Sequence, residues 1–255
     1  VLFRSVSTAQ FGIVVAAYAI SAGLSGLLAA GFADKYDRKK LLLFFYTGFI
    51  LGTLFCGLAP TYPLLLAARI FTGVFGGVIG SITFAIVTDL FLIEVRGRVM
   101  GFLQMAFASS QILGLPIGLY FANKWGWHSP FIMIVLVSIG VAIAILIYLK
   151  PIDEHLKVKT ERNAFRHLIK TISTPMYIKT FAATTLLATG GFMMMPFGAD
   201  FGVNNLKISL DQLPMLYMIT GIASMILGPL LGRASDSWGK YRMFVAGSIL
   251  MIFVV

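Results

Sequence analysis

The chain has 255 residues, of which 58% are hydrophobic and only 12% are charged, and its mean hydropathy is +0.91. This composition excludes most water-soluble proteins, in which about 25% of residues are charged, and its many aromatic residues exclude a disordered chain. The single cysteine, Cys56, excludes a disulfide framework and a cysteine-rich metal site. In so apolar a chain, we expect the net charge of +10 to set membrane topology and not to bind nucleic acid.

Apolar stretches of about 20 residues, the length that crosses a bilayer as a helix, recur along the chain. Eight are predicted: 10–33, 41–58, 63–90, 99–121, 130–149, 177–197, 212–231 and 243–255. Helix is the expected state, because backbone polar groups in hydrocarbon must be satisfied within their own segment. The sequence therefore predicts an all-α polytopic protein embedded in the lipid bilayer.

Basic residues fall mainly into alternate gaps between these stretches. Sixteen of the 20 lysines and arginines lie on one side, whereas Arg4, Lys124 and Lys207 lie on the other and Arg69 lies within a stretch. Because basic loops tend to remain in the cytoplasm, the side with sixteen cations is predicted to be cytoplasmic. The first residue would then be outside, and this start, with no initial Met, suggests that sequence is missing before it.

One long polar segment interrupts the apolar pattern. Residues 150–176 are rich in Lys, Glu, Thr and Asn, and we interpret them as a cytoplasmic linker. The linker divides the chain into a helical bundle at 1–149 and the start of a second bundle at 177–255.

A charged loop occurs twice. Residues 30–40 read AGFADKYDRKK, and residues 232–242 read GRASDSWGKYR. Aligning Asp34 with Asp236, 202 residues further on, places Arg38 opposite Lys240. Internal repeats of this kind are found in many transporters, whose sites lie at the interface between the repeats.

These loops resemble the signature of the major facilitator superfamily, Gly-x-x-x-Asp-basic-x-Gly-basic-basic, which lies between helices two and three and again, more weakly, between helices eight and nine. The second copy fits the signature at Gly232, Asp236, Gly239 and Lys240. The first copy has Ala30 in place of the leading glycine, with Gly31 one position later, and Asp37 in place of the second glycine. Other matches are Arg69 with its following glycines, Asp89-Leu90-Phe91 and Trp125-Gly126-Trp127.

The resemblance covers essentially the whole chain and implies a twelve-helix fold. One predicted helix precedes the first loop copy and two precede the second, so this chain would hold helices two to eight and part of helix nine. The bundle at 1–149 would lack its first helix, and helices ten to twelve would be absent. Within the superfamily, the chain is most similar to the proton-coupled drug and sugar efflux branch.

Arg69 is the leading candidate for a mechanistic residue. A cation within an apolar helix is costly unless it is paired, hydrated or near the membrane surface, so such residues usually face a cavity and act in function. The resemblance implies an arginine on helix four that couples protonation to substrate movement, often opposite a partner on helix one. Arg69 also lies soon after Pro63, so the alternative is a side chain that extends to the membrane interface.

Glycines on the same stretch predict close helix packing. Gly73 with Gly77, and Gly76 with Gly80, have the four-residue spacing of small residues that lets two membrane helices approach. We expect packing to be their main role.

A second group of residues is predicted to bend the stretch 99–121. Gly114, Pro116 and Gly118 lie in its middle, where proline removes a helix hydrogen bond. The resemblance implies the Gly-Pro motif of antiporters, although Leu115 separates the glycine from the proline here.

Asp34, Arg38 and Asp89 are predicted to meet on the cytoplasmic side. Asp34 ends one predicted helix and Asp89 ends another that returns to the same face, so Arg38 could bridge them. The resemblance implies that such a cluster gates the change between outward-open and inward-open states. The alternative is ordinary basic-loop charge.

Candidate substrate contacts are the polar residues within the first bundle. Gln104 and Gln111 lie seven residues apart, on one face of a helix, and Tyr18 adds polarity nearby. Polar groups in a membrane helix generally face the bundle interior. Hydrogen bonding between helices is the alternative role for the two glutamines.

The sequence therefore predicts a secondary active transporter that exports a small organic solute by alternating access, driven by a proton or ion gradient and without a cofactor or a bound metal. The three histidines lack metal-ligand spacing, and no catalytic or nucleotide-binding motif is found. Alternatives are an importer of the same superfamily, a polytopic membrane enzyme or a receptor that does not transport. We expect a monomer in the inner, or plasma, membrane of a bacterium, with a small molecule as its partner and no nucleic acid.

Overall fold

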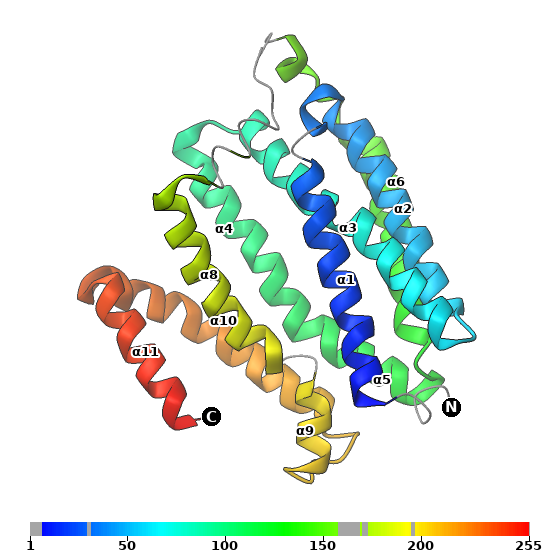
Figure 1. Cartoon of the computed structure of the whole chain (residues 1–255), viewed down its shortest axis with the longest axis vertical. Helices are drawn as coiled ribbons and strands as arrows, with labels where there is room; N and C mark the ends of the chain where they lie inside the picture. Colours follow the sequence, from blue (N-terminus) through cyan, green and yellow to red (C-terminus); the bar gives the residue numbers. More distant parts are fainter. Residues whose placement is uncertain (1–6, 30–31, 158–168, 170–172, 195–196, 255) are drawn as a thin grey trace.

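The computed structural model of the chain describes residues 7–29, 32–157, 169, 173–194 and 197–254, and every regular element within them is helical. The longer helices cross the molecule in alternating directions (Figure 1). They are α1 (Thr8–Ala29), α2 (Arg38–Leu58), α3 (Tyr62–Leu90), α4 (Ile93–Ser109), α5 (Leu115–Trp125), α6 (Ser129–Tyr148), α8 (Pro175–Met194), α10 (Leu213–Trp238) and α11 (Lys240–Val254). The shorter elements are η2 (Ala33–Lys35), η3 (Ser110–Gly114), η4 (Glu154–Lys157) and α9 (Gly198–Asn204).

The helix ends follow local chemistry. Asp37 caps α2, its side chain accepting a hydrogen bond from the backbone N–H of Lys40, and a proline lies in the first turn of both α3 and α6. The α5 helix stops where Gly126 adopts a φ of +90°, a conformation that a residue with a side chain rarely takes. Among the residues that the structure describes, four helices, α1, α2, α3 and α6, are long and apolar enough to cross a membrane.

The predicted stretch 99–121 differs most from the structure. The helix begins earlier, at Ile93, ends later, at Trp125, and is interrupted by the π-helical segment η3. This widened turn directly precedes Pro116, whose ring would crowd the carbonyl four residues before it in a regular helix. The stretch 212–231 is also longer than predicted, since α10 continues to Trp238. At the first loop, Ala33 and Asp34 belong to η2 and not to the end of a helix.

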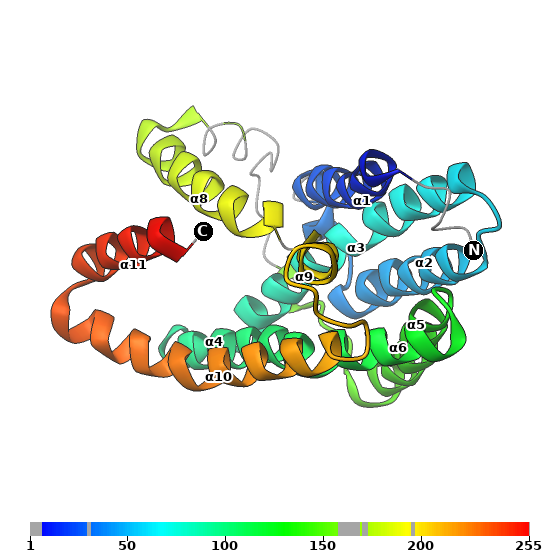
Figure 2. The ribbon, with the colours of Figure 1, turned by 90° about the horizontal axis from the view of Figure 1, so that it is seen from below.

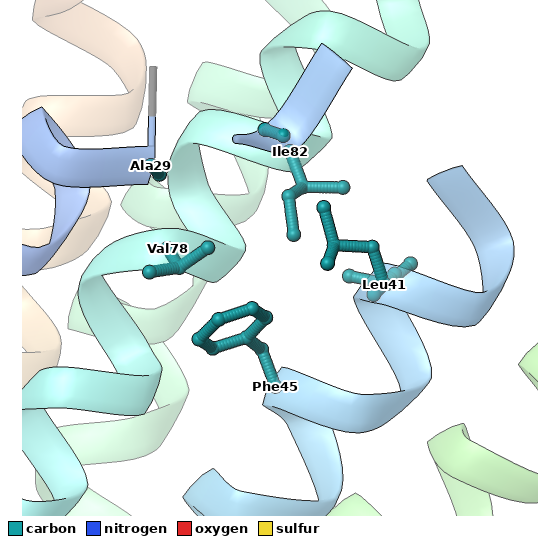
Figure 3. Packing of buried hydrophobic residues seen from close by; sticks show 7 residues of the cluster. Ala29, Leu41, Phe45, Val78 and Ile82 are labelled. Carbon is teal, nitrogen blue, oxygen red and sulfur yellow. The ribbon is translucent and has the colours of Figure 1, made fainter. Parts of the chain in front are cut away.

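The core of the first bundle lies where α3 meets α1 and α2. Figure 3 shows Leu41 and Phe45 of α2 pointing toward Val78 and Ile82 of α3, with Ala29 of α1 beside them. A second cluster nearer the other end contains Cys56 and Ala59 from the end of α2 and its following loop, with residues of α1 and α3. The α6 helix packs on the far side of α2.

The helices from α8 onward contact the preceding helices mainly through α10. This helix packs along α4, η3 and α5, and Figure 2 shows α10 running beside α4. Gly221 of α10 permits the approach, since a Cβ there would lie 2.6 Å from the side chain of Ile112 in η3. Asn123 at the end of α5 also donates a hydrogen bond to the carbonyl of Leu210, at 3.2 Å.

Candidate functional site

Arg38 lies at the centre of a cluster of charges. Its Nε donates to Asp89 Oδ2 at 2.9 Å, one terminal nitrogen donates to Asp34 Oδ1 at 2.8 Å, and the other donates to the carbonyl of Ala33 at 2.9 Å. Only 4% of the Arg38 surface is exposed. The arginine thus joins the start of α2, the turn η2 and the end of α3 at one end of the bundle, hereafter the charged end (Figure 1).

The two carboxylates of this cluster differ in their exposure. The side chain of Asp34 is 70% exposed, whereas that of Asp89 is 23% exposed. Asp34 lies four residues before Arg38, and the turn η2 brings the two side chains together. Asp89 reaches Arg38 because α3 ends beside the start of α2. A guanidinium buried among polar partners can hold two helix ends in one arrangement and lose its partners in another.

The segment after α6 docks on the same cluster. Ile152, which is 6% exposed, accepts a hydrogen bond from the backbone N–H of Arg38 and donates its own N–H to Asp37 Oδ2, at 3.0 and 2.9 Å. His155 of η4 lies next to the backbone of Tyr36, and Lys39 donates to the carbonyl of Leu146 near the end of α6. These contacts add the first residues of the linker to the charged end.

Asp37 and His155 were missed as site residues by the sequence reasoning. The available signal was the departure of the first loop from the family signature, in which Asp37 replaces a glycine. That aspartate performs two tasks, since one oxygen caps α2 and the other binds Ile152. His155 gives no comparable signal, because its contacts depend on how η4 folds back toward α3.

The second copy of the loop is described mainly by its backbone. Gly239 has a φ of +94° and separates α10 from α11. Gly232, Asp236 and Lys240 lie within these two helices, but the side chains of Asp236 and Lys240 and the surroundings of Gly232 fall outside the described part of the structure, as does all of Gly31. Their gating roles stay predictions.

Arg69 lies in the second turn of α3 and is half-buried. Its guanidinium carbon is 4.3 Å from the centre of the Tyr18 ring, which comes from α1. No described carboxylate lies within 4.0 Å of its nitrogens. The aromatic face offers a cation partial compensation for lost water, so the structure joins two residues that the sequence analysis gave separate roles.

Glycines of α3 let α1 lie this close. A Cβ on Gly73 would overlap the side chain of Ser21, and a Cβ on Gly77 would overlap the carbonyl of Ala22. At Gly76, an added Cβ would lie 3.0 Å from the hydroxyl oxygen of Tyr18. These glycines create a flat surface of α3 on which α1 packs, and this packing brings the ring of Tyr18 close to Arg69.

The other glycines predicted to pack or bend helices have more space around them than Gly73, Gly76 and Gly77. A Cβ on Gly80 or Gly118 would meet no described atom within 4 Å, and one on Gly114 would meet only Ser110, at 3.9 Å. The predicted close packing at Gly80 is therefore not found among the described residues. Gly114 ends η3 and Pro116 is the second residue of α5, so these residues mark the irregular turn of the helix.

The predicted substrate contacts Gln104 and Gln111 lie on α4 and η3. The side chains of Gln104 and Gln111 fall outside the described residues, although both positions are helical. No group of three histidine, cysteine or acidic side chains that could hold a metal ion occurs in the part of the chain that the structure describes.

Known proteins resemble the chain along nearly all of its length. The family model of the Major Facilitator Superfamily matches residues 3–255. An uncharacterized MFS-type transporter of Bacillus subtilis, YceJ, is 28% identical over 250 residues, which cover 96% of this chain and 63% of the relative. A probable sugar efflux transporter of Helicobacter pylori is 25% identical over 249 residues, covering 96% of this chain and 61% of the relative.

A further relative is named for drug resistance. Multidrug resistance protein 3 of Bacillus subtilis is 30% identical over 168 residues, which cover 66% of this chain and 33% of the relative. The chain spans less than two thirds of the length of each of these relatives. The all-helical fold predicted from the sequence and the family expected from the loop motifs are both confirmed. The chain belongs to the Major Facilitator Superfamily and is a multi-pass integral membrane protein.

Proposed function

We propose that the chain works in a secondary active transporter that exports a small organic solute, of the drug or sugar class, by alternating access coupled to a proton gradient. Two of its relatives carry names that refer to sugar efflux and multidrug resistance, which favours export over import. In this proposal, residues 1–149 and 177–255 belong to two bundles that move relative to each other, and residues 150–176 connect them on the cytoplasmic side.

The contact between Arg69 and Tyr18 is the observation that carries the proposal. A cation on an apolar helix, stacked 4.3 Å from an aromatic ring of another helix and without a carboxylate among its described neighbours, can exchange partners when a proton or substrate arrives. Tyr18 holds the guanidinium between α1 and α3, where the glycines bring these helices together. Arg69 is the proposed coupling residue, and Tyr18 lines the proposed substrate path with Gln104 and Gln111.

The charged end supplies the second element of the proposed mechanism. Arg38 bonds to both Asp34 and Asp89, so its contacts stabilise one relative placement of α2 and α3. A change of conformation that separates these helix ends must break those bonds, and the cluster would then act as a gate. The corresponding residues of the second loop, Gly232, Asp236, Gly239 and Lys240, are proposed to act in the other bundle. Gly31 belongs to the proposed gate of the first bundle.

The proposed setting follows from the bacterial origin of the two relatives that cover most of the chain. We place the transporter in a bacterial inner membrane, working as a monomer with the ion gradient as its driving force and no cofactor. Lipid and the transported small molecule are its proposed partners.

The test is transport by the full-length protein in proteoliposomes with an imposed proton gradient. Efflux of ethidium and of a labelled hexose is followed together with internal pH. Arg69→Ala should reduce gradient-driven transport by about tenfold or more, the kinetic equivalent of 1.4 kcal/mol. Arg69→Lys retains the charge but loses the planar group, and we expect it to recover part of the rate.

Lys124→Ala is the matched control. Lys124 is also a cation near aromatic rings, 5.1 Å from Trp125 and 5.6 Å from Tyr120, but it lies at the end of α5. We expect this variant to transport normally. If neither solute moved under any gradient, the export function would be refuted; if Arg69→Ala transported as well as the control, Arg69 would not be the coupling residue.

A further inference from the structure

The imidazole of His155 occupies a buried position between the linker and the charged end. Its Nε2 lies 3.2 Å from the carbonyl oxygen of Tyr36, and its Nδ1 lies 3.7 Å from Asp89 Oδ2. The side chain is 14% exposed. Nδ1 itself is buried and, within the described residues, has no hydrogen-bond partner. Neither the coupling residue nor the three-residue cluster of Arg38 uses this group.

The hydrogen-bond chemistry of the two ring nitrogens determines what this position accommodates. A carbonyl oxygen only accepts, so Nε2 must carry a proton to bond with Tyr36. In neutral His155, Nδ1 then has a lone pair and faces the carboxylate of Asp89, which is also an acceptor. A proton on Nδ1 converts this contact between two acceptors into an N–H donor facing a carboxylate.

Charged groups from three other elements form the cluster that this ring contacts. Asp89 from α3 faces the ring directly, and Arg38 from α2 shares that carboxylate, while Asp34 from η2 also binds Arg38. The cluster that faces His155 thus contains one guanidinium and two carboxylates. On the linker itself, Asp153 and Glu154 are exposed.

We propose that His155 is a proton-binding site and a positioning residue of the charged end, which fastens residues 152–155 of the linker to the Arg38 cluster when Nδ1 is protonated. Histidine is the side chain that generally changes charge between pH 5 and 8. The docking of the linker, and with it the bond from Ile152 to Asp37, then responds to the pH on the linker side. Proton binding and docking concern the chain alone, whereas any consequence for transport rests on the proposed function.

The test measures amide hydrogen exchange of Ile152 in the full-length protein in lipid nanodiscs at pH 5.5 and 8.0. Each rate is divided by the intrinsic rate at the same pH, because intrinsic exchange itself depends on pH. We expect protection of Ile152 to be greater at pH 5.5, by about fivefold, the size of a partly exposed ion pair. In His155→Gln, which keeps an N–H donor for Tyr36 but cannot titrate, protection should be the same at both pH values.

Two further variants make the result specific. Asp89→Asn removes the carboxylate that faces Nδ1 and should also abolish the pH dependence. His128→Gln is the control, because His128 binds the carbonyl of Gly57 at the opposite end of the bundle, and this variant should keep the full dependence. Equal protection of Ile152 at both pH values in the unaltered protein, or a persisting difference in His155→Gln, would overturn the proposal. The amide-exchange results for the unaltered protein and for His155→Gln can be interpreted whether or not the protein transports a solute.

Discussion

The two copies of the charged loop begin their following helices at aligned positions but form their turns differently. In the first copy, α2 begins at Arg38 after Asp37, which has a φ of −55° and caps the helix with its side chain. In the second copy, α11 begins at Lys240 after Gly239, which has a φ of +94° and no side chain. The first loop contains the separate turn η2, whereas α10 runs on to Trp238 and reverses at a single residue.

The same loop motif can therefore turn the chain into the next helix in two ways. A glycine permits a left-handed backbone, so the second loop can turn at Gly239 without a capping side chain at that position. Asp37 needs no left-handed backbone and uses its carboxylate to bind both Lys40 and Ile152. The first loop thereby gains a connection to the linker, and the second loop gains a shorter turn.

The largest expected effect concerns the buried arginine of the first loop. Asp89→Ala leaves the guanidinium of Arg38 without its less exposed carboxylate, and we expect a loss of about 3 kcal/mol in unfolding free energy. Asp34→Ala is the matched variant, with an expected loss of about 0–1 kcal/mol because that carboxylate is 70% exposed. Unfolding in detergent micelles measures both. Equal losses would mean that burial does not distinguish the two partners.

The next effect concerns the turn of the second loop. Gly239→Ala places a Cβ on a residue with a φ of +94°, and we expect destabilisation of about 1–2 kcal/mol. Gly80→Ala is the control, since a Cβ there meets no described atom within 4 Å and the backbone is helical. The same unfolding measurement applies. A loss at position 80 as large as that at position 239 would contradict the role of the left-handed turn.

The smallest effect concerns the capping aspartate of the first loop. Asp37→Ala removes the acceptor for Lys40 and should lower stability by about 1 kcal/mol. Asp37→Asn retains an oxygen that can cap the helix, and should recover most of that loss. Amide exchange of Lys40 and Ile152 gives the local measurement: both amides should lose protection in the alanine variant. Protection unchanged at Ile152 would show that Asp37 does not hold the linker.

The sequence pattern predicted most helix positions because each membrane helix must satisfy its own backbone hydrogen bonds. It predicted the ends of 99–121 and 212–231 poorly. The first helix runs beyond both predicted ends and contains a π-helical turn just before Pro116. The second remains helical through polar residues that were predicted to form a loop, and it ends at Trp238, where no apolar run marks the end. Hydropathy does not report how far a helix extends beyond the membrane.

For the candidate site, residue types were easier to predict than partners. A cation on an apolar stretch identified Arg69, and the loop motif identified Asp34, Arg38 and Asp89. The stacking of Tyr18 on Arg69 could not be read in advance, since it depends on the contact of α1 with the glycines of α3. The contact of His155 with Asp89 likewise joins residues 66 positions apart.

Composition, run length and motif spacing are local properties of the chain, and they are enough to predict a helical membrane protein with an asymmetric charge distribution and a repeated loop. The burial of Arg38 among three partners, the bond from Asp37 to Ile152 and the contact of the His155 ring with a carboxylate follow from the folded arrangement alone. These are contacts between segments distant in the chain, and their geometry depends on how close the helices approach.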